Sequence, residues 1–144
     1  RFSTEAKTWS EIHPHGSRPT AREHHSAVWH AGALLVLGGL AKGGRLGDMW
    51  AYSKQAKAWT ELHPSGPAPA PRAKHTAVWC HHQMLVFGGF DSNGDVFSFQ
   101  TLPGGDSWSI LHPARGGPCP AARECHGALW SARQLLICGG HDGR

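Results

Sequence analysis

The chain has 144 residues and a formal net charge of +4, and its 19 glycines and 10 prolines separate short apolar runs. These residues lack the three-residue period of collagen and act as turn punctuation, which excludes a fibrous or low-complexity chain. No apolar run approaches the roughly 18 to 20 residues of a membrane span, and no Lys/Arg run marks a nucleic-acid-binding tract. We therefore expect neither a membrane nor a nucleic acid as a partner.

Residues 1–4 align with residues 51–54, so the chain opens in the middle of a repeated unit, and residues 141–144 end it in mid-unit. Within the first unit we predict short strands at residues 9–12, 25–29, 34–37 and 48–52. Bounded apolar runs and period-two alternation favour strands, and no window has the 3.6-residue spacing of an amphipathic helix. The strand at 34–37 is expected to stop at a Gly-Gly pair.

The repeat has a period of about 50 residues, which indicates supersecondary units stacked side by side. One frame holds an arginine, a histidine three residues later, an apolar run with a tryptophan, and a Gly-Gly pair. Its three copies begin at Arg22, Arg72 and Arg123. A second marker, a tryptophan followed four residues later by His-Pro, occurs at Trp9, Trp59 and Trp108.

Four short antiparallel strands in each unit of about 50 residues predict an all-β fold built of propeller blades. We divide the chain into a half blade (1–12), two blades (13–62 and 63–111) and a second half blade (112–144).

At the residues that close each unit the sequence resembles the kelch repeat, in which a Gly-Gly pair is followed by an aromatic residue and a tryptophan. The matching residues are Gly38, Gly39, Tyr52 and Trp59, then Gly88, Gly89, Phe99 and Trp108. The lead-in also fits at Pro71-Arg72 and His75, whereas Ala21 and Ala122 replace the proline in the other copies. The resemblance implies a partial kelch β-propeller of about three blades.

We expect structural roles for the repeated glycines and tryptophans. Glycine pairs allow backbone conformations closed to other residues, and indole rings fill the space between blades. The glycine pairs could instead form a phosphate-binding loop, but no helix is predicted to follow them. The tryptophans could form a platform on which bases stack, but packing between blades is the favoured interpretation because they occur in every blade. The positions are Gly38, Gly39, Gly88, Gly89, Gly139, Gly140, Trp9, Trp29, Trp59, Trp79, Trp108 and Trp130.

The resemblance implies that the lead-in loops (13–24, 63–74, 112–125) and the loops after each Gly-Gly pair (40–47, 90–94, 141–144) open on one face, where kelch propellers bind proteins. Arginines at such a rim suit carboxylate or phosphate groups through paired N–H donors. An alternative is that each arginine ties adjacent blades together through a carboxylate or a carbonyl. The candidate partner-binding residues are Arg22, Arg72, Arg123, Lys74, Asp91 and Asn93, and the expected partner is a protein with acidic groups.

We expect an interaction module rather than an enzyme, with no catalytic residue, metal or cofactor. By the resemblance His25, His75 and His126 approach the central channel, but neighbouring blades hold them too far apart for ligands that must lie within ~2.1 Å of a metal. The alternative is a segment of an enzyme-associated propeller, such as a metal-dependent oxidase or a specifier-like protein. Cys119 and Cys125 leave a local disulfide open, against reduced thiols in a cytoplasmic protein, the compartment that we expect.

Propellers usually contain four to eight blades, so three blades' worth of strands leaves two arrangements open. In the first, these residues are part of a longer propeller of six or seven blades. In the second, the half blade 1–12 pairs with residues 123–140 of another copy, and a homodimer completes a six-bladed ring.

Overall fold

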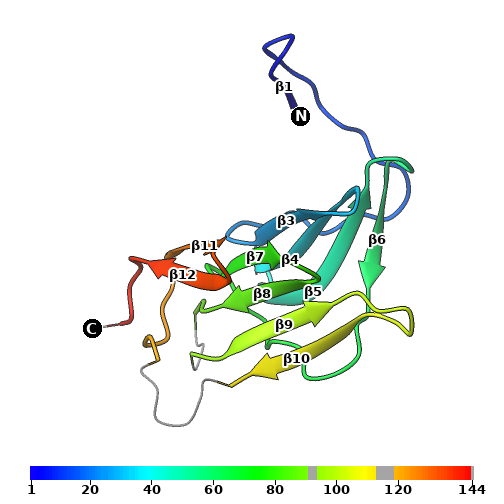
Figure 1. Cartoon of the computed structure of the whole chain (residues 1–144). Helices are drawn as coiled ribbons and strands as arrows, with labels where there is room; N and C mark the ends of the chain where they lie inside the picture. The colour runs from blue at the N-terminus through cyan, green and yellow to red at the C-terminus, as the bar shows by residue number, and fades with distance from the viewer. Residues whose placement is uncertain (91–93, 113–118, 144) are drawn as a thin grey trace.

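The computed structural model describes residues 1–90, 94–112 and 119–143, and every regular element in these ranges is a β-strand. The strands form four antiparallel sheets, two of four strands and two of two strands (Figure 1). The all-β prediction, with four-stranded antiparallel units, is confirmed. The described ranges contain no helix that could serve as a membrane span.

Each four-stranded blade is a meander in which every strand pairs with the next one along the chain. The first blade contains β3 (Ser26–His30), β4 (Ala33–Ala41), β5 (Gly44–Ser53) and β6 (Ala58–Leu62). The second contains β7 (Thr76–Cys80), β8 (Gln83–Phe87), β9 (Val96–Gln100) and β10 (Ser107–Leu111). The register is shared, because Val36 opposes Trp50 in one blade and Val86 opposes Phe97 in the other.

The two-stranded sheets are the halves of a blade. At the N-terminus β1 (Phe2–Ser3) pairs with β2 (Thr8–Trp9), and Figure 1 shows this hairpin standing away from the other sheets. Its register places Phe2 opposite Trp9, as Tyr52 lies opposite Trp59 in the first blade. At the other end β11 (Gly127–Ser131) pairs with β12 (Gln134–Cys138), in the register of the two inner strands of a complete blade.

Three predicted strand ends are wrong by more than one residue, one of them the start of the strand expected at 48–52, which begins as β5 at Gly44 within the loop expected at 40–47. The strand expected at residues 9–12 ends at Trp9, because β1 offers no partner beyond the Phe2–Trp9 pair and a bond from Ser10 N to Arg1 O. The strand expected to stop at the first Gly-Gly pair continues as β4 to residue 41 through a bulge between Leu37 and Gly39. In the second blade, where the following connection is shorter, β8 does end before the glycines.

The hydrophobic core lies between the two complete blades. Side chains alternate between the faces of a strand, so each sheet presents one apolar set to its neighbour. Val28, Leu35, Leu37 and Met49 of the first blade meet a buried set from the second blade: Met84, Val86, Phe97, Phe99 and Trp108. One blade therefore has no complete core until the next one covers it.

The seam between blades is closest at the first glycine of each pair. A Cβ on Gly38 would lie 2.7 Å from the carbonyl oxygen of Arg72 in the next blade, and one on Gly88 would lie closer still to that of Arg123. Both glycines have positive φ, +60° and +72°. Only glycine combines this backbone conformation with so close an approach of the neighbouring chain.

Hydrogen bonds cross the seam at equivalent positions of successive units. Side chains join Ser26 Oγ to His75 Nε2 at 2.8 Å and Thr76 Oγ1 to His126 Nε2 at 2.7 Å. Backbone amides donate from Gly39 to Arg72 O, from Gly89 to Arg123 O, from Lys74 to His24 O and from Cys125 to Lys74 O. The donor and acceptor positions recur, so each unit docks on the next in the same way.

The repeated tryptophans differ in burial. Trp108 is buried in the core between the blades, and the Trp79 ring stacks on His30 of the preceding blade with centroids 3.6 Å apart. Trp9 and Trp29 are exposed, so the packing between blades that we expected of every tryptophan is not found at these two. The β1–β2 hairpin contacts none of the strands of the first blade, so it does not cover Trp29 as the first blade covers Trp79.

Gly88 and Gly139 are the first glycines of two pairs, and only Gly88 is closely approached by the next unit. Comparing them separates the effect of close approach from that of backbone strain. Gly88→Ala should lower the free energy of unfolding by about 3 to 5 kcal/mol, because the new methyl group meets the Arg123 carbonyl. Gly139→Ala has nearly the same φ, +69°, but meets nothing within 4 Å, so it should cost about 1 to 2 kcal/mol. Urea unfolding of dilute protein, followed by tryptophan fluorescence, measures both, and equal losses would contradict the close-approach account.

Candidate functional site

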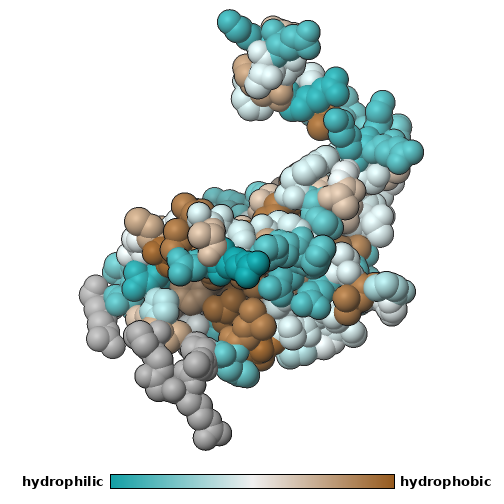
Figure 2. All heavy atoms as spheres, viewed as in Figure 1, coloured by the Kyte–Doolittle hydropathy of each residue, from teal (hydrophilic) through white to brown (hydrophobic). Residues whose placement is uncertain are grey.

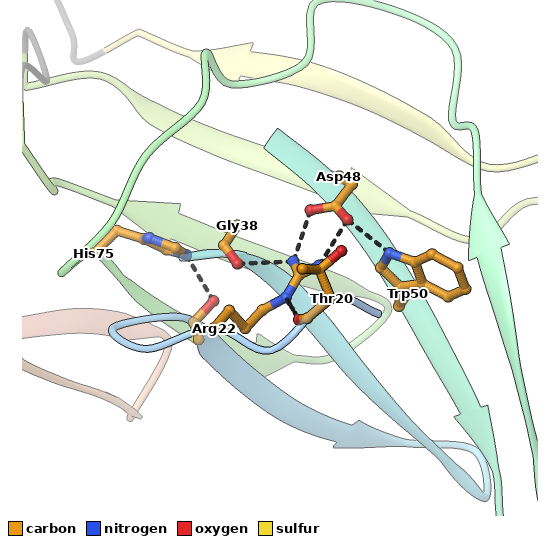
Figure 3. A network of polar contacts seen from close by, with 7 residues as sticks. Thr20, Arg22, Gly38, Asp48, Trp50 and His75 are labelled. Atoms are coloured by element: carbon orange, nitrogen blue, oxygen red, sulfur yellow. Dashed lines mark hydrogen bonds and ion pairs between the residues drawn. The ribbon is translucent and has the colours of Figure 1, made fainter. Parts of the chain in front are cut away.

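The lead-in arginine of the first blade is buried in a polar network of its own blade (Figure 3). Arg22 Nη1 and Nη2 donate to the two carboxylate oxygens of Asp48 at 2.6 and 2.8 Å, and Nη1 also donates to Gly38 O at 3.0 Å. Trp50 Nε1 donates to the same carboxylate at 2.7 Å. The hydrogen bonds from Arg22 hold the pKa of Asp48 below its ordinary value, which keeps this carboxylate charged at neutral pH.

The other two lead-in arginines repeat the backbone part of this network. Arg72 Nη1 donates to Gly88 O at 2.9 Å, and Arg123 Nη1 donates to Gly139 O at 2.8 Å. Arg72 is 5% exposed, and its guanidinium carbon lies 4.8 Å from the centroid of the Phe97 ring. Each arginine thus joins its lead-in segment to the first glycine carbonyl of the same blade.

The sequence left open the alternative that the arginine side chains tie adjacent blades together. This alternative is corrected, because each of these side chains bonds within its own blade. A side-chain tie between blades comes instead from Lys74, whose Nζ lies 3.3 Å from Glu124 Oε1 of the following unit. Four of the candidates for partner binding are described: Arg22, Arg72, Arg123 and Lys74. All four have contacts within the chain, and partner binding by them stays a prediction. Asp91 and Asn93 lie outside the described residues.

The seam histidines are neutral groups at ordinary pH. Burial lowers the pKa of His75 to about 4, with nearby Arg72 adding to the effect. Burial also lowers the pKa of His126 and, together with Arg22, that of His25. The rings of His75 and His126 bond to hydroxyls of the preceding blade.

Among the described residues, no three His, Cys, Asp or Glu side chains are grouped to hold a metal. The four cysteines, all within the described ranges, are free thiols, with Cys80 buried and Cys119, Cys125 and Cys138 exposed. The Cys119–Cys125 bridge that the sequence left open is thus not formed in this structure.

Two cavities occupy equivalent positions between a lead-in segment and the loop after a Gly-Gly pair; we call them the first and second rim cavities. The first, of about 320 Å³, is lined by Gly89, Phe90, Ala122, Arg123, Glu124, His141, Asp142 and Gly143. The second, of about 330 Å³, is lined by Ala21, Arg22, Glu23, Leu40, Ala41 and Lys42. Backbone bridges hold both shapes, since Glu23 pairs with Leu40 and Glu124 pairs with His141.

The resemblance implied that the lead-in loops lie wholly at this end of the blades, and for two of them the structure shows otherwise. The first halves of the loops at residues 13–24 and 63–74 pair with the beginning of an outer strand, where His15 bridges to Ala58 and Ser65 bridges to Ser107. Each of these two loops therefore runs along the outer edge of a blade before it enters the innermost strand.

Sequence reasoning missed Phe90 and Arg45. Phe90 is half exposed at the first rim cavity, and the Arg45 guanidinium from the first blade lies 4.9 Å from its ring centroid. Phe90 follows a Gly-Gly pair, where the other copies have Leu40 and His141, so its departure from the repeat is the one signal in the sequence that marks it.

The repeated blades and their glycine seams agree with a comparison against family models. The model described as the KLHDC2/KLHL20/DRC7 Kelch-repeats domain matches residues 1–140. The chain belongs to the kelch-repeat family. Kelch-repeat domains are generally protein-interaction modules. A search of curated proteins found no match to the chain.

The depressed pKa of His75 makes the kelch seam sensitive to acid. Between pH 6.5 and about 4 the unfolded chain binds protons that the folded His75 does not, so stability falls as the pH falls. One such group loses at most roughly 1.4 kcal/mol per pH unit, or about 3 kcal/mol in all. Urea midpoints measured from pH 7 to pH 4 should therefore fall less steeply for His75→Gln than for the wild type. Replacement of exposed His82 by Gln should leave the slope unchanged.

Arg72 provides a test of the intrablade tie. Arg72→Ala leaves Gly88 O without its donor and opens space over Phe97, so we expect a loss of about 2 to 4 kcal/mol. Lys42→Ala removes an exposed charge at the second rim cavity and should change stability by less than about 0.5 kcal/mol. An unchanged melting temperature for Arg72→Ala would show that the tie has no structural weight.

Proposed function

We propose that this kelch segment binds an exposed segment of a partner protein at the first rim cavity, with Phe90 as the apolar contact. The observation that carries the proposal is the fixed exposure of this ring. Phe90 is 49% exposed, yet Arg45 lies over one face and Phe90 N donates to Ala73 O at 3.1 Å. A preorganised aromatic ring at the mouth of a concave surface is the kind of residue that contributes most to protein recognition.

The charges beside Phe90 support a partner with carboxylate groups. In the first blade Asp48 occupies both Nη atoms of Arg22. At the equivalent Arg123 the recorded bonds use Nε and Nη1 and go to backbone carbonyls, and within the described ranges no carboxylate is recorded against its Nη2. A partner carboxylate there would make a charge-assisted hydrogen bond of the kind that Asp48 makes with Arg22.

The second rim cavity extends the same chemistry around the rim. Lys42 and Leu40 there take the places of Gly143 and His141 in the first cavity, so a cation and an apolar side chain are again adjacent. A partner segment that contacts both cavities would reach from the first repeat unit to the third. The chain's net charge of +4 favours encounter with an acidic partner at low salt.

The test uses random peptides displayed on phage and selected on the immobilised chain. Selected peptides should carry Asp or Glu near an apolar residue and should bind more weakly at high salt. Phe90→Ser should lower their affinity at least tenfold, because the exposed ring is lost. Leu102→Ser is the matched control, since Leu102 is 51% exposed but lies in the turn before β10, and its affinity should stay unchanged. Equal effects of the two changes would contradict a site at the rim.

A further inference from the structure

Four turns lie at the end of the blades that is opposite to the rim cavities. They are the β3–β4 turn at residues 31–32, the β5–β6 turn at 54–57, the β7–β8 turn at 81–82 and the β11–β12 turn at 132–133. Each of these turns joins two antiparallel strands that run back toward the rim. In Figure 1 the β5–β6 turn lies on the right, and the C-terminus, beside the first rim cavity, lies on the left. The surface formed by the four turns is called here the turn-end surface.

A row of alternating imidazole and indole rings connects the turns of three successive units. The His30 ring stacks on the Trp79 ring of the next blade, with centroids 3.6 Å apart and an interplanar angle of 14°. Trp79 Nε1 donates to His81 O at 3.2 Å. The His81 ring in turn lies edge-on to the Trp130 ring of the third unit, with centroids 5.7 Å apart. These contacts fix the β3–β4, β7–β8 and β11–β12 turns relative to one another.

The two histidines of this row occupy different positions of the repeat. At the position of His30 the other units have Cys80 and Ser131, and at the position of His81 both have alanine. Each seam therefore places an imidazole against the following tryptophan from a different position of the motif. Copying of one unit does not explain this agreement, so the continuous row is a property of this chain rather than of the repeat.

The cations of the turn-end surface have no recorded carboxylate partner. Lys54, Lys57 and Arg133 are exposed, and within the described ranges no ion pair is recorded for any of them. The four turns contain no Asp or Glu. At the other end of the blades, by contrast, Arg22 and Lys74 are paired with carboxylates of the chain itself. The turn-end surface thus presents positive charge that the fold does not neutralise.

The backbone holds these charges in fixed places. Lys54 N donates to Gly32 O at 3.3 Å, which joins the β5–β6 turn to the β3–β4 turn. Arg133 has a φ of +64° at the position where the first blade has Gly32, in a hairpin turn that favours glycine or asparagine. Figure 2 shows hydrophilic residues around the β5–β6 turn, at the upper right of the molecule. A ligand therefore meets cations on an ordered backbone.

We propose that the turn-end surface binds an acidic, extended segment of a partner protein, separately from the site at the rim. Carboxylates of such a segment would pair with Lys54 or Lys57 of the first blade and with Arg133 of the third unit. Neighbouring sheets pack about 10 Å apart, so two seams separate these units by about 20 Å, which about six or seven extended residues span.

The row of rings favours a protein segment over a single-stranded nucleic acid. Bases bind to such surfaces by stacking on open aromatic faces. At the turn-end surface the His30 ring already covers a face of Trp79, with only 3.6 Å between the ring centroids. The cations remain available, whereas this stacking face does not.

The first experiment measures the binding of fluorescein-labelled decaglutamate to the 144-residue chain by fluorescence anisotropy. At about 0.1 M salt, charges more than about 10 Å from the peptide are largely screened. Lys54→Glu and Arg133→Glu should each weaken binding about fivefold or more, because a like charge replaces the cation that the peptide contacts. Circular dichroism confirms that each variant is folded.

Lys42→Glu is the matched control, because it makes the same change of charge at the second rim cavity. It should leave the affinity for decaglutamate within about twofold of the wild type. Phe90→Ser, at the first rim cavity, should also leave it unchanged, so this proposal and the site at the rim can fail independently. Absence of binding, or equal weakening by Lys42→Glu and the two turn-end variants, would overturn the proposal.

Peptide length tests whether one segment lies across the units. Extended tetraglutamate reaches about 13 Å, which is too short to contact cations of the first and third units together. Decaglutamate should therefore bind more tightly than tetraglutamate, and Arg133→Glu should remove most of this gain. A gain that is the same in Arg133→Glu and in the wild type would contradict a segment that spans the turns.

Oligothymidylate of matched length and label tests the class of partner. It should bind more weakly than decaglutamate at the same salt concentration, because His30 covers the Trp79 ring on which a base would stack. Equal or tighter binding of oligothymidylate would assign the surface to single-stranded nucleic acid and would overturn its assignment to a protein segment.

Discussion

The close approach of successive blades at the first glycine of each pair is the constraint on which the rest of this structure depends. At Gly38 and Gly88 the carbonyl of the next unit's arginine lies where a side chain would begin. This approach brings the amide of the second glycine within reach of the same carbonyl. It also brings the histidine of one blade against the hydroxyl of the blade before it. Apolar packing then follows, because the sheets are held face to face along their inner strands.

The polar groups of the seam and of the blade have separate tasks. The lead-in arginines act inside a blade, where they fix the segment that enters the innermost strand. The histidines act between blades, and burial keeps them neutral, so the seam contains hydrogen bonds without the cost of burying a charge. A kelch unit thus uses the arginine to fix its own shape and the histidine to contact a neighbouring unit.

In the function proposed here, recognition depends on residues that the repeat does not fix. Phe90 and Arg45 occupy positions where the copies differ, and they meet across two blades. Phe90 is held by the bond from its amide to Ala73 O, and Arg45 pairs with Leu40 in the β4–β5 ladder. Variation at such positions would change the proposed binding surface without disturbing the packing of the blades.

The sequence by itself determined the repeat, the strand type, the blade length and the importance of the glycine pairs, because these depend on local patterns that recur every 50 residues or so. Only the tertiary structure decided what each repeated residue touches. Arg72 and Trp79 are both repeated positions of the same frame. Arg72 bonds within its own blade, whereas Trp79 packs on the preceding blade. Trp108 is buried and Trp9, at the same place in the motif, is exposed, because a residue's surroundings depend on which sheet lies beside it. Phe90 was missed because its role comes from an arginine on another blade, and a distance across a seam leaves no period in the sequence.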